Sequence, residues 1–205
     1  MAGGTTLKEK NKRSAPLILL YISFFSFIAI SLPAGLLNIA WTYMQGTFEV
    51  SIESLGVLLA FAMVGNLIAT FSSGQLVAWL RIGPFLLAGA LVAMVGALGY
   101  VLMPTWPLLL ATAFITYFGV GMIDAGMNTF VSARYSAGPL NWLHAFFGIG
   151  LTFAPFFVTF IIVNLGASWR WSYLAAVAAF ALLSLMILLT LPRWRIGENT
   201  SAGQT

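Results

Sequence analysis

Asp124 is the residue with the clearest chemical potential, because it is the only charged residue between Arg81 and Arg134 and lies inside a long apolar stretch. A carboxylate near the middle of a membrane helix costs about 2.5–3.5 kcal/mol on insertion scales, so it usually faces a partner group or an aqueous cavity. Such an acid is typical of a proton or substrate pathway. Asp124 therefore predicts transport, and the alternative is a structural acid bonded to a neighbouring helix.

Asn128 follows Asp124 by four residues. Side chains at this spacing share one helix face about 5–6 Å apart, so we expect a single cavity to contact both. The candidate substrate-binding residues are Asn38, Trp41, Asn66, Tyr117, Asp124, Asn128 and His144. The alternatives are that the amides only join helices by hydrogen bonds, that His144 fixes a loop, and that the aromatic residues pack or lie in the interfacial belt.

Composition excludes several classes of protein. Of 205 residues, 60% are hydrophobic and 7% are charged, whereas a water-soluble surface usually needs about a quarter or more charged residues. The chain has no cysteine, no clustered metal-ligand spacing, no glycine-rich nucleotide loop and no Ser/His/Asp set. We therefore expect a lipid bilayer as its surroundings, no enzyme activity and no cofactor. Its cations are scattered rather than gathered in a stripe, which argues against nucleic acid.

Six apolar windows reach the length of about 20 residues that a membrane-spanning helix needs. They cover residues 16–45, 53–79, 84–103, 107–133, 141–165 and 171–192, separated by breaks rich in proline and glycine. The predicted fold class is an all-α membrane protein with six transmembrane helices. The third and sixth windows carry almost no polar residue, so we expect them to face lipid on most sides and the first, second, fourth and fifth to surround a cavity. We expect a basic segment over 1–14, one helical bundle over 15–192 and a polar tail over 193–205.

Charge at alternate helix ends predicts the orientation. On this topology one side collects eight of the nine cations, and the other side has Arg170 alone. The eight are Lys8, Lys10, Lys12, Arg13, Arg81, Arg134, Arg193 and Arg195. Because cytoplasmic loops carry the excess of Lys and Arg, both termini are expected in the cytoplasm, with the protein in the cell (inner) membrane.

A short repeat links the first and fourth windows. A glycine stands three residues before the polar residue in each, at Gly35 before Asn38 and at Gly121 before Asp124. The two windows run in opposite directions on the predicted topology. This is the arrangement of inverted three-helix repeats, in which the binding site lies at the repeat interface.

Three segments carry a resemblance to a known family: GVGMIDAGMN at 119–128, NWLHAFFGIG at 141–150 and SWRW at 168–171. Together with the six windows they resemble the amino-terminal half of the major facilitator superfamily, in the sugar-porter branch that includes fucose:proton symporters. The resemblance implies two inverted three-helix repeats, half of a major facilitator fold. It also implies that Asp124, with Asn128 four residues later, acts in proton-coupled sugar transport.

Two departures from that family restrict what can be transferred. The segment Gly74–Trp79 lacks the acid of the superfamily's signature between helices 2 and 3, which leaves the usual cytoplasmic gating contact without its carboxylate. Asn38 and Ile39 stand where symporters of this branch have a second acid. Coupling in this chain would therefore depend on Asp124.

Members of the superfamily have twelve helices in two halves, whereas this sequence has six windows, so we expect a homodimer about an axis along the membrane normal. Neutral amides and one acid, without a buried cation, favour a neutral polyol-like or cationic solute, with a sugar as the first choice. The alternatives are an exporter of lipophilic or cationic compounds, a non-transporting accessory or sensing subunit, and half of a heterodimeric transporter.

Overall fold

The computed structural model describes residues 17–135 and 137–195, which are all-helical and contain no strand. Six helices are long and apolar enough to cross a membrane, which confirms the predicted fold class. They are α2 (Leu17–Phe48), α3 (Ser54–Leu80), α4 (Ile82–Leu102), α5 (Trp106–Arg134), α6 (Ala137–Thr159, continued by the π-helix η1, Phe160–Asn164) and α7 (Tyr173–Thr190, flanked by the 3₁₀ turns η2, Trp169–Ser172, and η3, Leu191–Arg193). The predicted segment 1–14 and the tail after residue 195 lie outside the described residues.

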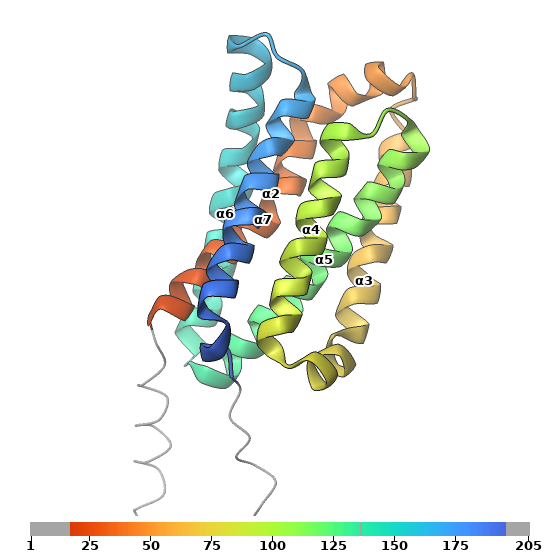
Figure 1. The fold of residues 1–205 in the computed structure, drawn as a ribbon. Coiled ribbons are helices and arrows are strands. Elements are labelled where there is room, and N and C mark those ends of the chain that lie inside the picture. Colours follow the sequence, from red (N-terminus) through yellow and green to blue (C-terminus); the bar gives the residue numbers. More distant parts are fainter. Residues whose placement is uncertain (1–16, 136, 196–205) are drawn as a thin grey trace, which may run out of the picture.

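Successive helices run in opposite directions, so the described chain begins and ends at the same end of the bundle (Figure 1). We call this the terminal end, and the opposite end, where α2 finishes, the far end. Arg81, Arg134, Arg193 and Arg195 lie at the terminal end, and Glu49, Glu53 and Arg170 at the far end. The charges thus separate as expected, while the side of the membrane on which each end lies stays a prediction.

Sequence breakers set the helix boundaries. Arg81 alone separates α3 from α4, with φ 66° and ψ 159°, and Pro84 fits in the first turn of α4, where a missing N–H is tolerated. Pro107 occupies the first turn of α5 in the same way. The connections are therefore short, and consecutive helices run antiparallel.

Helix packing follows a two-fold pattern that exchanges the first three helices with the last three. Under this exchange α2, α3 and α4 correspond to α5, α6 and α7. The packing of α2 along α6 then corresponds to the packing of α5 along α3, and α4 and α7 pack against each other (Figure 1). Gly35 of α2 lies against Ala154 of α6, and Gly121 of α5 lies against Ala69 of α3 in the matching place. The short repeat that is visible in the sequence therefore corresponds to equivalent helix contacts.

The reciprocal contacts are matched as well. Gly65 of α3 meets the backbone of Phe114 in α5, and Gly150 of α6 meets the backbone of Ile28 in α2. Small residues let membrane helices approach until their backbones touch. The packing thus gives α2 and α5 equivalent positions in two inverted three-helix units.

Helix α4 departs from this symmetry and from the expectation that the third and sixth windows face lipid on most sides. Half of its membrane window is buried, compared with 28% for α7. Gly96 and Gly99 lie directly against Thr116 and Thr112 of α5, whereas α7 contains no glycine. The least buried helices are instead α3 at 22% and α6 at 17%.

Aromatic residues and Arg170 join the far ends of several helices. The Arg170 guanidinium donates to the carbonyl groups of Tyr100 and Val101, at 3.2 Å each, and lies 4.8 Å from the centre of the Trp169 ring. Trp169 Nε1 in turn donates to Thr47 Oγ1 at 2.9 Å. These contacts hold the ends of α2 and α4 to the beginning of α7.

Candidate functional site

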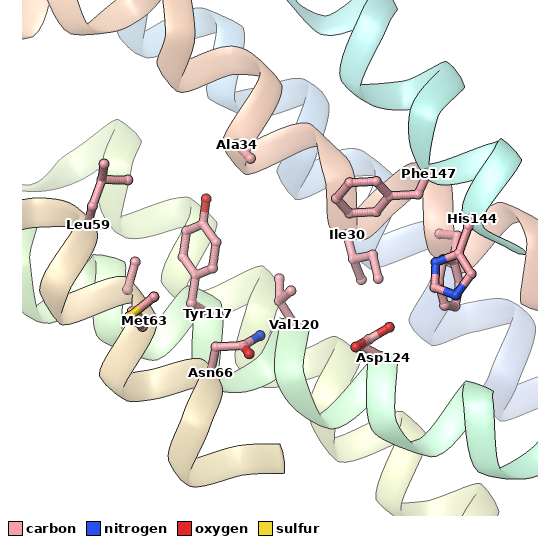
Figure 2. Close-up of a pocket in the computed structure, with 12 residues that line it drawn as sticks. Ile30, Ala34, Leu59, Met63, Asn66, Tyr117, Val120, Asp124, His144 and Phe147 are labelled. Atoms are coloured by element: carbon pink, nitrogen blue, oxygen red, sulfur yellow. The ribbon is translucent and has the colours of Figure 1, made fainter.

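A cavity of about 570 Å³ lies between α2, α3, α5 and α6, the four helices that the sequence indicates as its walls. Its polar lining consists of Asn66, Tyr117, Asp124 and His144. Its apolar lining consists of Phe27, Ile30, Ala34, Leu59, Ala62, Met63, Val120 and Phe147. Figure 2 shows these side chains converging from the four helices. The volume falls in the range of pockets that bind small molecules.

Asp124 enters the cavity from α5 and is half-buried. The Asn128 amide nitrogen, one turn later, donates to Asp124 Oδ1 and to the Asp124 main-chain carbonyl, at 2.9 Å each. Both amide N–H groups of Asn128 are therefore engaged by Asp124. Asn128 is not among the residues that line the cavity, and it contributes by holding the carboxylate in one orientation.

His144 reaches the same part of the cavity from α6, and Figure 2 shows its ring and the Asp124 carboxylate turned into the same end of the space. The ring packs edge-on against Phe27 of α2, with centroids 5.6 Å apart and planes at 89°. Neither imidazole nitrogen has a hydrogen-bond partner among the described residues. The ring is thus positioned by packing and keeps both nitrogens available.

Asn66 and Tyr117 line another part of the cavity, on α3 and α5 (Figure 2). The two helices approach closely here because Gly121 of α5 lies against the Asn66 backbone. The Asn66 amide and the Tyr117 hydroxyl form no hydrogen bond within the described residues. Both therefore present free donor and acceptor groups to whatever occupies the cavity.

Two of the predicted site residues lie elsewhere. Trp41 is 5% exposed and packs against Trp106 with ring centroids 6.0 Å apart, so it belongs to the far-end aromatic packing. Asn38 is exposed on α2, but it is not among the residues that line the cavity. The structure thus brings together four of the seven predicted side chains and places a fifth, Asn128, directly behind one of them.

The apolar lining was not predicted, because its residues have the same composition as lipid-facing ones. One sequence signal could have located part of it. Ala34 precedes Gly35 and Val120 precedes Gly121, so these two lining residues occupy equivalent positions in the short repeat. The alignment of the repeats therefore carries information about the cavity that composition lacks.

The chemistry of the cavity is that of an amphipathic binding site. Residues of α2 contribute an apolar wall, while α3, α5 and α6 contribute an amide, a phenol, a carboxylate and an imidazole. Among the described residues no lysine or arginine lines it. The site can hydrogen-bond hydroxyl groups, stack an apolar face and hold or release a proton, and it has no permanent cation to balance an anionic ligand.

The sequence matches no protein-family model. It is similar to Monosaccharide-sensing protein 2 of Arabidopsis thaliana, with 26% identity over 152 residues, covering 70% of this chain and 21% of that protein. The chain thus spans about a fifth of the length of the curated relative that it matches. This protein is a bundle of six membrane-type helices with a distant similarity to a monosaccharide-sensing protein.

Proposed function

We propose that the chain is a six-helix half of a secondary transporter for a small polar solute of the monosaccharide class. It acts as a homodimer in the cell (inner) membrane, with both termini in the cytoplasm and with proton coupling through Asp124. The observation that carries this proposal is the cavity between α2, α3, α5 and α6, where a membrane-embedded carboxylate meets several polar side chains without hydrogen-bond partners. Acids at such positions are rarely retained without a function.

The cavity lining favours a neutral ring with polar edges. Phe27 and Phe147 offer apolar surface for the face of a sugar ring, and Asn66 and Tyr117 offer hydrogen bonds to its hydroxyl groups. The distant relative is named for monosaccharide sensing, which supports a monosaccharide as the first ligand to test.

The test is uptake of radiolabelled monosaccharides into proteoliposomes with and without an imposed pH gradient. We expect accumulation driven by the gradient in the wild type and its loss in Asp124→Asn. The matched control is Glu53→Gln, which makes the same chemical change at an exposed acid near the far end. Full pH dependence of uptake in Asp124→Asn would contradict the coupling role, and absence of uptake for every monosaccharide would contradict the substrate class.

Self-association is supported by the surface of α3 and α6. Glycines in membrane helices usually permit close approach, yet Gly56 and Gly74 of α3 and Gly148 of α6 have no atom within 4 Å of an added Cβ. The same helices are the least buried of the six, and they border the cavity. A second copy placed against α3 and α6 would cover these glycines and bring its own helices beside the cavity.

The oligomeric state can be measured on the chain purified alone and reconstituted in nanodiscs. We expect a dimer whose mass halves in Gly74→Leu, because leucine would hold the two copies apart, with Gly46→Leu in α2 as the control. Uptake by a monomeric chain would contradict the homodimer. Activity that requires a different protein would instead establish half of a heterodimer or an accessory subunit.

Export of lipophilic cations is the second candidate, and one observation favours it. Eight of the twelve lining residues are apolar, and the acid at Asp124 has no fixed cation beside it among the described residues. Asn66→Ala separates the two functions, because loss of the amide should weaken binding of a sugar and leave binding of a lipophilic cation, which has no hydroxyl groups, nearly unchanged. A third reading, a sensing subunit, agrees with the name of the relative and predicts binding without uptake.

A further inference from the structure

Polar side chains within the membrane helices fall into two groups. Most hydroxyl groups are satisfied by their own helix: Ser72, Thr152 and Thr159 each donate to the carbonyl four residues earlier, at 2.6, 2.8 and 3.0 Å. A hydroxyl bonded in this way can face lipid at little cost. The second group forms no hydrogen bond among the described residues, and these side chains need water, a ligand or another protein.

Three members of the second group lie together on the far half of α2. Asn38 and Thr42 are exposed, Gln45 is partly exposed, and none of them forms a hydrogen bond among the described residues. Asn38 lies ten residues before the end of α2, which at 1.5 Å per residue places it about 15 Å inside the helix end. An unsatisfied amide at that depth is unfavourable against hydrocarbon.

The three residues continue the wall of the cavity. Phe27, Ile30 and Ala34 line the cavity from α2, and on a helix with 3.6 residues per turn Asn38 and Gln45 lie within about 20° of the line through Phe27. Thr42 is turned about 60° from that line, on the same side as Asn38. The apolar wall of α2 therefore becomes a polar strip as the helix leaves the cavity toward the far end.

The internal two-fold pattern relates this strip to the functional face of α5. Gly35 and Gly121 take equivalent places against α6 and α3, so Asn38 matches Asp124 and Thr42 matches Asn128. Because the two units are inverted, the α5 residues lead from the cavity toward the terminal end, and the α2 residues lead toward the far end.

We propose that Asn38, Thr42 and Gln45, the α2 strip, line the part of the solute path that runs from the cavity to the far end. This inference rests on the proposed transport function and assigns to Asn38 a place on the path outside the central cavity. The occupant is water and the transported neutral solute, whose hydroxyl groups supply the hydrogen bonds that the strip lacks. The matching residues of α5, Asp124 and Asn128, lie along the part of the path that runs from the cavity to the terminal end.

The absence of cysteine from the sequence permits a direct test, because any introduced thiol is unique. Thr42→Cys is compared with Val95→Cys, an apolar position 57% exposed on α4 and at a similar depth from the far end. Both are treated in proteoliposomes with a charged, membrane-impermeant methanethiosulfonate applied from each side. Thiolates form in water, so Thr42→Cys should react at least about tenfold faster than Val95→Cys, from the far side.

A transported monosaccharide at saturating concentration should slow the labelling of Thr42→Cys and leave Val95→Cys unchanged. Equal labelling rates for the two variants would overturn the inference while leaving measured uptake, and so the proposed function, in place. Efficient disulfide cross-linking of two Thr42→Cys chains would also overturn it, by assigning the strip to a subunit contact. Absence of uptake with every solute would contradict the proposed transport function, and with it the assignment of the strip to a solute path.

Discussion

Close packing of α2 on α6 gives a stability prediction whose size can be worked from the structure. A Cβ added at Gly35 would lie 2.6 Å from Ala154 Cβ and 3.1 Å from the Leu151 carbonyl oxygen, whereas ordinary contact begins at 3.4 Å. The helices would have to separate locally by about 0.8 Å, the difference between 3.4 and 2.6 Å. Overpacking of this kind costs about 1–3 kcal/mol.

Gly35→Ala also gains helix propensity, which would obscure the packing cost in a single measurement. Gly46 lies in the same helix and has no atom within 4 Å of an added Cβ, so Gly46→Ala gains propensity without the clash. Alanine is favoured over glycine by up to about 1 kcal/mol in a helix. The difference between the two variants therefore isolates the packing cost, and we expect Gly35→Ala to be less stable than Gly46→Ala by about 1–3 kcal/mol.

Unfolding of the chain in mixed micelles, followed by fluorescence of its seven tryptophans, measures this difference. Gly121→Ala is the symmetry-related companion, because its Cβ would lie 2.8 Å from the Asn66 carbonyl oxygen and 3.0 Å from Ala69 Cβ. It should lose a similar amount of stability. Equal stability of Gly35→Ala and Gly46→Ala would refute the close α2–α6 contact and, with it, the packing basis of the inverted repeat.

Three further substitutions test single contacts. Tyr117→Phe removes a hydroxyl without a protein partner, so it should leave stability within about 0.5 kcal/mol and raise the KM of uptake up to about tenfold; unchanged KM would place the substrate elsewhere. Asn128→Ala frees the Asp124 carboxylate and should lower the maximal rate of uptake more than it raises KM, and a pure KM effect would indicate direct substrate contact. Arg170→Met removes two hydrogen bonds to the last turn of α4 and the cation–ring contact, so thermal unfolding should show a loss of about 1–3 kcal/mol; wild-type stability would contradict that anchoring role.

Local sequence features predicted the helices well. Length, apolar composition and the proline and glycine breaks located all six, because each helix must satisfy its backbone within itself in a bilayer. The same features placed Asp124 and its neighbour Asn128 on one face, since that relation is set by the helical repeat alone. The matching positions of Gly35 and Gly121 in the short repeat indicated the internal symmetry. That each glycine is a contact point with another helix became clear only from the structure, which identifies the partner helices.

Predictions failed where they depended on which way a helix is turned. α4 was expected to face lipid because it carries almost no polar residue, yet its glycines bury it against α5. Trp41 was expected near the ligand, but its indole packs into the far-end aromatic residues instead. Composition could not separate these cases, because an apolar side chain suits lipid and protein equally well in a membrane.

The sequence by itself determined that this chain is a membrane-type bundle of six helices with one acid inside an apolar helix, because those properties depend on runs of residues and on the cost of charge in hydrocarbon. The tertiary structure decided which polar side chains meet. Helix rotation and contact distance are set by glycines whose partners lie in another helix, so the meeting of Asp124 with His144, Asn66 and Tyr117 around one cavity is not readable along the chain.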